Sequence, residues 1–248
     1  MKNIILGVVQ GLTEFLPVSS SGHLVIFSHF MNIDTNVPYF ALLHLATFFA
    51  VLIFVWQEVL QLIKGLFKWE KESLSLILKL IISSIPAAII GFTLESTVES
   101  AFSSLSLVGI FLLITGFLLF SSDYFNGEKN IQQITYLDAL VIGIMQAIAI
   151  FPGLSRSGST IFAALLMKMK REDAVKYSFL MSLPVTFGAG IFEITKVSFN
   201  PSMILGSIAA FGFGLIGLLL VKKAVIAGKL KYFSIYCFII GFLAIFIL

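Results

Sequence analysis

Two stretches of this chain combine side chains that can do chemistry. The first, QGLTEFLPVSSSGH from Gln10 to His23, holds a glutamine, a glutamate, three serines and a histidine. The second, QAIAIFPGLSRSGST from Gln146 to Thr160, adds an arginine among serines and a threonine. Carboxylate, imidazole and hydroxyl groups act as base, acid or nucleophile, and a guanidinium offers a planar fork of donors to phosphate. The two stretches therefore indicate a site for an anionic, oxygen-rich ligand and favour phosphoryl transfer.

Four of these residues are predicted to be catalytic: Glu14, Ser20, His23 and Arg156. Either His23 or Ser20 attacks phosphorus, and the sequence leaves that choice open. Glu14 orients or deprotonates the nucleophile, while Arg156 holds the phosphoryl group. The predicted substrate-binding residues are Gln10, Ser19, Ser21, Ser155, Ser157 and Thr160.

The same residues also have a purely structural interpretation. The serines can serve only as helix caps, and Arg156 can form a structural ion pair with Glu14. His29 is interpreted as a helix-face residue, and His44 as a residue of a spanning helix that either packs or lines the cavity. Glu14 is harder to explain structurally, because a charge at membrane depth is unfavourable and usually functional.

The composition indicates that these residues belong to a membrane protein. Of the 248 residues, 58% are hydrophobic and 12% are charged, and the mean hydropathy is +1.04. Soluble domains average about 25% charged residues, so the chain is predicted to be an integral membrane protein. The single cysteine, Cys237, excludes an internal disulfide. The first residues do not read as a cleaved signal peptide, because Gln10 and Glu14 interrupt the apolar run.

Six apolar segments have the length that a membrane crossing needs, about 20 residues. They cover roughly 39–56, 74–94, 104–122, 174–195, 203–221 and 231–248. The segment 57–73 has an amphipathic pattern and is interpreted as a surface segment, with Trp56 and Trp69 as anchors at the membrane interface.

Four further apolar pieces are too short to cross and form two pairs, 3–16 with 22–32 and 138–151 with 159–168. Each pair is joined by a Pro/Gly/Ser break, LPVSSSG or FPGLSRSG. Two short helices around a polar break are typical of a re-entrant hairpin, since non-helical backbone at membrane depth must be surrounded by protein or a water-filled cavity. The expected caps of the second helices are Ser20 or Ser21 and Ser157 or Ser159.

The two hairpins repeat each other at an offset of 136 residues. The matched pairs are Gly7 with Gly143, Gln10 with Gln146, Ser19 with Ser155, Ser21 with Ser157, and Gly22 with Gly158. Three crossings in each copy force the second copy to insert upside down. We therefore predict one all-α polytopic membrane domain over 1–248, with six transmembrane helices and two re-entrant helical hairpins. It is an inverted-topology repeat, with repeat 1 at about 1–125 and repeat 2 at about 136–248.

The basic residues predict the orientation. On this topology 13 Lys and Arg residues fall at one side of the membrane, and two, Lys2 and Lys196, at the other. The 13 are Lys64, Lys68, Lys71, Lys79, Lys129, Lys168, Lys170, Arg171, Lys176, Lys222, Lys223, Lys229 and Lys231. Positive charge favours the cytoplasmic side. Both termini are therefore expected outside, with the hairpin tips meeting near the midplane and the active site opening to the outer face.

The segments GVVQGLTEFLPVSSSGHL and PGLSRSGST resemble the two signatures of the undecaprenyl-diphosphate phosphatase family, membrane phosphatases tied to bacitracin resistance. KREDAVKYSFLMSLPV, from Lys170, resembles the family's continuation. The resemblance implies hydrolysis of a C55 polyprenyl diphosphate to the monophosphate, which recycles the lipid carrier of cell-wall synthesis in the bacterial plasma membrane. The family's essential groups fall on Glu14, His23 and Arg156. Its supporting hydroxyls fall on Ser19, Ser20, Ser155, Ser157 and Thr160.

The resemblance also implies a divalent cation. Gln10 occupies the first acidic position of the family's E/Q-x-x-x-E pattern, so a site with two carboxylates is not available. Glu14 together with lipid phosphate oxygens can still hold Mg²⁺ or Ca²⁺, and we expect the metal there.

A second function stays open, a lipid-phosphate flippase or transporter, because inverted repeats with broken helices are a transport architecture. A pure carrier needs a phosphate-binding arginine but not an adjacent Glu, Ser and His. The predicted partners are the polyprenyl diphosphate lipid and the bilayer, with no nucleic acid. A homodimer is one option for the oligomeric state.

Overall fold

The computed structural model describes residues 1–32, 37–194 and 201–247, and these residues are almost entirely helical. Within them the one extended pairing is an isolated bridge between Lys129 and Met169. The helices are α1 (Lys2–Phe15), α2 (Ser20–Phe30), α3 (Val37–Phe54), α4 (Trp56–Phe67), α5 (Lys71–Thr93), α6 (Glu95–Ala101), α7 (Leu105–Ser122), α8 (Tyr136–Ile148), α9 (Arg156–Leu166), α10 (Arg171–Ile194), α11 (Pro201–Ile226) and α12 (Leu230–Phe246).

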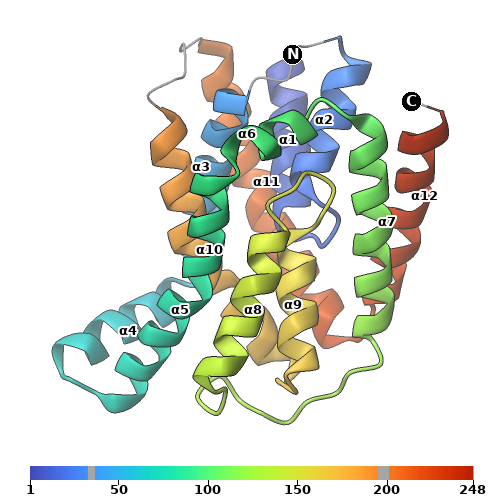
Figure 1. Cartoon of the computed structure of the whole chain (residues 1–248). Helices are drawn as coiled ribbons and strands as arrows, with labels where there is room; N and C mark the ends of the chain where they lie inside the picture. Colours follow the sequence, from blue (N-terminus) through green and yellow to red (C-terminus); the bar gives the residue numbers. More distant parts are fainter. Residues whose placement is uncertain (33–36, 195–200, 248) are drawn as a thin grey trace.

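A helix occupies each of the six segments predicted to cross the membrane: α3, α5, α7, α10, α11 and α12. Among the described helices, α5, α7 and α11 are by themselves long and apolar enough to cross. The pair α3 and α4 passes the same test together, although it is bent by 74°. The chain is therefore an all-helical, multi-pass membrane protein. The bend corrects the predicted end of the segment 39–56, because α3 stops at Phe54 and α4 turns aside (Figure 1).

The break between α1 and α2 is caused by Pro17. A residue that precedes proline is driven out of the helical region, and Leu16 is accordingly extended, with ψ at 138°. The chain then turns through Ser19, whose φ is +69°, and α2 begins at Ser20. In the second hairpin Pro152 follows α8, and Gly153 takes a φ of +102° that a side chain would oppose.

The caps of the two inner helices differ from the predicted ones. Ser19 caps α2 by accepting from Gly22 N at 3.3 Å, and Ser155 caps α9 by accepting from Gly158 N at 3.1 Å. The predictions of Ser20 or Ser21 and of Ser157 or Ser159 were wrong. An N-cap must stand outside the helix with non-helical dihedrals, whereas those four serines already lie in the first turns. Ser19 and Ser155 are themselves 136 residues apart.

Small residues let the helices approach closely. Gly7 of α1 lies against the backbone of Gly206 in α11, and Gly143 of α8 lies against the backbone of Ser83 in α5. The same device joins α7 to α12, where Gly109 faces the carbonyl of Gly241. Close backbone approach at glycine is typical of helix association in membranes, where packing rather than hydrophobic transfer holds helices together.

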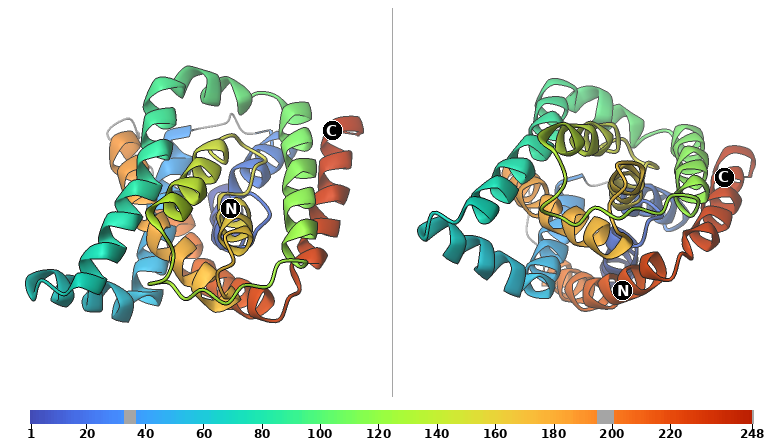
Figure 2. Two further views of the ribbon diagram at one scale, coloured as in Figure 1. Left: turned by 60° about the horizontal axis from the view of Figure 1, so that its bottom comes forward. Right: turned by 90° about the horizontal axis from the view of Figure 1, so that it is seen from below.

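The two hairpins enter from opposite ends of the molecule and meet inside it (Figure 1). Seen from below, α9 lies near the middle with the longer helices around it (Figure 2). At the meeting point Gly153 N donates to Ser19 Oγ at 3.0 Å, and Gly22 packs against the Gly153 backbone. Thr115 of α7 holds the second tip by donating to Gly153 O at 2.9 Å. The polar breaks of both hairpins are thereby fixed against each other.

The basic loops gather at one end of the molecule. Lys129 and Lys168 pair through their backbones, and Arg171 lies 3.5 Å from the Asp123 carboxylate. That carboxylate also accepts from Lys231 N at 2.9 Å, which ties in the start of α12. The N-terminus and the end of α12 lie at the opposite end (Figure 1). Lys196, predicted on the sparsely charged side, is outside the described residues.

Candidate active site

The carboxylate of Glu14 is the centre of the site. Its Oε2 atom accepts from Ser20 Oγ at 2.6 Å and from Gln10 Nε2 at 2.9 Å, and lies 3.3 Å from His44 Nε2. Its Oε1 atom accepts from Arg156 Nη2. The cluster therefore joins α1, α2, α3 and the start of α9 around one carboxylate. Its members are shielded, since Glu14 is 6% exposed and Gln10 fully buried.

Arg156 uses one nitrogen for this contact and keeps the rest of its fork free. Among the residues that the structure describes, no other acceptor receives a hydrogen bond from its guanidinium. The side chain is 17% exposed, against 4% for Glu14. Arg156 thus has donors left for phosphate oxygens that approach from the open side.

Backbone donors add to this positive site. The cap serines use the third N–H group of α2 and of α9. Within the described chain, the N–H groups of Ser20 and Ser21 in α2, and of Arg156 and Ser157 in α9, have no acceptor. Two helix N-termini with free N–H groups therefore point into one region, an arrangement that favours a bound anion.

Ser20 is the hydroxyl best placed to act as a nucleophile. Its Oγ already donates to a carboxylate at a distance typical of a strong hydrogen bond. A carboxylate that accepts the hydroxyl proton is the geometry expected of a general base and its nucleophile.

His23 lies apart from this cluster. Its Nδ1 contacts Ser19 O at 2.8 Å, and its Nε2 contacts Tyr236 Oη at 2.7 Å. The Tyr236 ring stacks on the imidazole with centroids 5.5 Å apart. Both ring nitrogens are therefore engaged, and the imidazole links α2 to α12. Its contacts with Tyr236 were not visible in the sequence, because the two residues are 213 positions apart.

The remaining predicted hydroxyls hold the hairpins in place. Ser19 Oγ receives Gly153 N and lies 3.3 Å from Ser21 Oγ. Ser157 Oγ lies 3.3 Å from Ser155 Oγ and donates to Leu16 O at 3.4 Å. Thr160 Oγ1 lies 2.7 Å from Ser178 Oγ, which ties α9 to α10.

For His44 the sequence left open whether the side chain packs in a spanning helix or lines the cavity. Its one signal was a lone imidazole inside an apolar helix, which equally fits a packed histidine. The structure brings it to Glu14 because α3 packs beside α1. The sequence gives no measure of that packing.

A metal ion has few protein ligands here. The described residues contain no group of three or more His, Cys, Asp or Glu side chains arranged to hold one. Glu14 is the sole carboxylate of the cluster, and Gln10 Oε1 is a buried oxygen without a partner in the described structure. These two oxygens fit a hard cation only when phosphate oxygens complete its shell.

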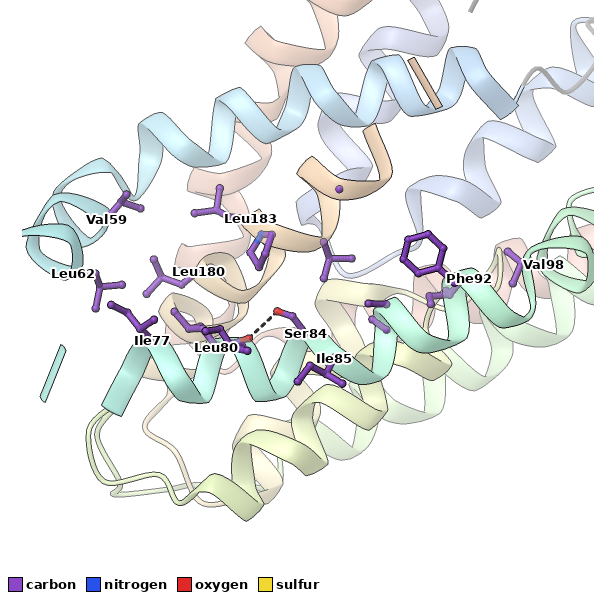
Figure 3. A pocket seen from close by; sticks show the side chains of 18 of the residues that line it. Val59, Leu62, Ile77, Leu80, Ser84, Ile85, Phe92, Val98, Leu180 and Leu183 are labelled. Carbon is purple, nitrogen blue, oxygen red and sulfur yellow. Dashed lines mark hydrogen bonds between the residues drawn. The ribbon is translucent and has the colours of Figure 1, made fainter. Parts of the chain in front are cut away.

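The described structure also holds an apolar groove of about 790 Å³ (Figure 3). Its walls come from α4, α5, α6 and α10, with Leu80, Phe92 and Leu183 among the lining side chains. Ile150, in the break between α8 and α9, also lines it, so the groove reaches the hairpin that carries Arg156.

Comparison with known proteins gives full-length matches. The family described as bacitracin resistance protein BacA matches residues 3–243. An undecaprenyl-diphosphatase of Thermosipho africanus is 52% identical over 247 residues, which is 100% of both chains. One from Methanococcus maripaludis strain C6 is 58% identical over 243 residues, 98% of both chains, and one from Thermotoga petrophila is 41% identical over the same share.

Proposed function

Because this chain belongs to the bacitracin resistance protein BacA family, we propose that it is a membrane phosphatase of undecaprenyl diphosphate. It releases one phosphate and leaves undecaprenyl monophosphate, the lipid carrier that cell-wall synthesis reuses. The observation that carries the proposal is the hydrogen bond from Ser20 Oγ to Glu14 Oε2 at 2.6 Å, beside the free donors of Arg156. A nucleophile, a base and a phosphate-binding cation thus share one buried cluster.

Ser20 attacks the terminal phosphorus while Glu14 accepts the hydroxyl proton. The bond from Oγ to phosphorus forms, and the bond from phosphorus to the bridging oxygen breaks. Its electron pair leaves with the lipid monophosphate, an anion that needs no proton. Water then attacks the phosphoserine, gives one proton to the cluster, and releases inorganic phosphate as Ser20 regains its hydroxyl.

Arg156 and the two helix N-termini stabilise charge on the transferring group. The guanidinium can hold two phosphate oxygens, and the free N–H groups of α2 and α9 face the same region. In a water-poor site such preorganised donors act more strongly than they do in water. A divalent cation between Glu14 and the substrate oxygens would neutralise further phosphate charge.

His23 supports the site rather than attacking phosphorus. Its two nitrogens are engaged by Ser19 O and by Tyr236, and a nucleophilic nitrogen must be free. We assign it the task of fixing α2, and with it Ser20, against α12.

The apolar groove suits the polyprenyl chain. Its lining is almost wholly hydrocarbon, with Leu80, Ile85 and Leu183 facing it (Figure 3). Isoprene units buried there are removed from water and held beside the α8–α9 hairpin. The diphosphate then lies at the polar tips while the chain follows α5.

In the membrane we propose six crossings, by α3, α5, α7, α10, α11 and α12, with α1–α2 and α8–α9 as re-entrant hairpins. The two copies span about 1–125 and 136–248 in opposite orientations. The packing of α1 on α11 and of α8 on α5 supports this, because it is the pairing that an inverted repeat generates. The end with Lys129, Lys168 and Arg171 faces the cytoplasm, so both termini and the site opening face outward.

Phosphate release by detergent-purified protein tests the function. With undecaprenyl diphosphate as substrate, we expect one inorganic phosphate and one lipid monophosphate per turnover, and no release by Ser20→Ala. A flippase predicts the opposite, namely lipid transfer between the leaflets of a vesicle with no phosphate released. Normal turnover by Ser20→Ala would exclude the serine mechanism while leaving the phosphatase activity.

A further inference from the structure

Two neighbouring helices outside the Glu14 cluster contact the breaks of the two hairpins. α7 packs along α12, and the pair stands on the right of Figure 1. In the proposed repeat, α7 is the last helix of the first copy and α12 is the last helix of the second. α7 contacts the break of the second hairpin, and α12 contacts the break of the first. Each hairpin is therefore held by the last helix of the other copy.

One face of α7 follows the break between α8 and α9. Phe111, Thr115 and Leu119 are four residues apart and share this face. The Phe111 ring packs on Phe151, with centroids 5.7 Å apart, and Leu119 packs against Gly158 in the first turn of α9. Thr115 lies between these two contacts and is 1% exposed. Its hydroxyl is therefore shielded from water and directed at the backbone of the break.

The Thr115 hydroxyl satisfies two backbone groups of the break at once. Its Oγ1 donates to Gly153 O at 2.9 Å and accepts from Ser155 N at 3.0 Å. Both residues are buried, and in the described part of the chain neither backbone group has another hydrogen-bond partner. Ser155 in turn caps α9 through Gly158 N, and the next residue is Arg156. The hydroxyl therefore fixes the backbone from which the Arg156 side chain starts.

α12 makes the matching contacts with the first hairpin. Tyr236 Oη lies 2.7 Å from His23 Nε2, and His23 Nδ1 lies 2.8 Å from Ser19 O. A carbonyl can only accept, so in the neutral imidazole Nδ1 donates to it and Nε2 accepts from the tyrosine hydroxyl. The next residue, Cys237, contacts Pro17 O through its Sγ at 3.8 Å. Two adjacent residues of α12 thus hold the backbone that leads into α2.

We propose that Thr115 and Tyr236 are positioning residues of the reaction, an inference that rests on the proposed phosphatase activity. Thr115 sets the direction of the Arg156 fork, and Tyr236 sets the place of Ser20 through His23. Both act through other residues and do not themselves take part in the chemistry. A misplacement of about 1 Å between reacting groups can lower a rate about 100-fold, so the loss of one such hydroxyl is measurable.

Isosteric substitutions separate the hydroxyl from the shape of the side chain. Thr115→Val keeps the shape and removes the hydroxyl, whereas Thr115→Ser keeps the hydroxyl and removes a methyl group. With undecaprenyl diphosphate as substrate, we expect kcat to fall about 10- to 100-fold in Thr115→Val, with little change in KM, because a misdirected fork matters most as charge shifts in the transition state. Thr115→Ser should keep near-wild-type kcat. Tyr236→Phe keeps the ring that stacks on His23 and should lower kcat about tenfold.

Thr93→Val and Tyr232→Phe are the matched controls. They are the same changes at exposed residues of α5 and α12, and the Thr93 hydroxyl donates only within its own helix, to Ile89 O. Both variants should keep wild-type kcat. A thermal melt reports the folding of every variant.

A double substitution shows whether Thr115 acts through Arg156. Arg156→Lys has no fork to direct, so in that background Thr115→Val should lower kcat by less than about threefold. An equal loss in both backgrounds, or normal kcat in folded Thr115→Val or Tyr236→Phe, would overturn the proposal. If Thr115→Val does not fold, Tyr236→Phe decides alone. An inactive wild type would instead count against the phosphatase function.

Discussion

Replacing Glu14 with glutamine tests the centre of the reaction. The carboxylate offers one oxygen to Arg156 and the other to Ser20 and Gln10. A carboxamide of the same shape has a single acceptor oxygen and an NH₂ group. If its oxygen faces Arg156, the NH₂ group faces Ser20 and Gln10, and these must then accept through the Ser20 hydroxyl oxygen and the Gln10 amide oxygen. In the reverse orientation Arg156 loses its acceptor. Either Ser20 loses the acceptor of its proton or Arg156 loses its partner.

The magnitude follows from those contacts. A hydrogen bond to a charged group contributes about 1.5–3 kcal/mol, which is about 10- to 150-fold in rate. Loss of a general base removes about 10²- to 10⁴-fold. We therefore expect kcat to fall by at least about 10³-fold. The stability loss should be smaller, about 2 kcal/mol, because Arg156 is partly exposed and can be hydrated.

Steady-state phosphate release by the purified variant gives kcat, and a thermal melt gives the loss of stability. Glu72→Gln is the matched control, the same change at an exposed carboxylate in the first turn of α5, and it should leave both values unchanged. Folded Glu14→Gln protein with near-normal turnover would refute the assignment of Glu14 as base.

Three further predictions follow from other parts of the structure. Arg156→Lys keeps the charge but not the fork, so kcat should fall about 10²-fold with little change in the melt; an unstable protein of normal turnover would make Arg156 structural. Gly143→Ala places a methyl group against the Ser83 backbone and should destabilise the protein by about 1–3 kcal/mol. Gly91→Ala, which meets open space, is its control, and equal melting of the two would contradict the packing argument. Tags at both termini should be reachable from outside intact cells and a tag near Lys129 should not, and termini on opposite sides would break the topology.

Much of the fold was predictable because its signals are local. Apolar length locates the six long helices, and the turn before Pro17 follows from the steric rule for residues that precede proline. The meeting of the hairpins followed from the repeat, which is also written in the sequence. The short helix α6 and the 74° angle between α3 and α4 were not predicted, because hydropathy reports burial in lipid and not the direction of the chain.

The site was predictable to the extent that its residues lie in the two signatures. Gln10, Glu14, Ser20 and Arg156 come together as their types and spacing indicated. His23 was grouped with them for its imidazole and for the family resemblance, and in the structure its ring nitrogens contact Ser19 O and Tyr236 Oη. Helical periodicity within α2 is a weak guide there, since the helix has only 11 residues and apolar neighbours on most faces.

The offset of 136 residues also relates two positions of the site to two positions of the groove. At the offset of 136 residues, the counterparts of Glu14 and His44 are Ile150 and Leu180. Both of these residues line the apolar groove. At these two positions the first copy therefore carries polar side chains of the Glu14 cluster, and the second copy carries apolar side chains of the groove. The proposed substrate has a charged head and a long apolar chain, and the α8–α9 hairpin contributes Arg156 to the polar cluster and Ile150 to the apolar groove.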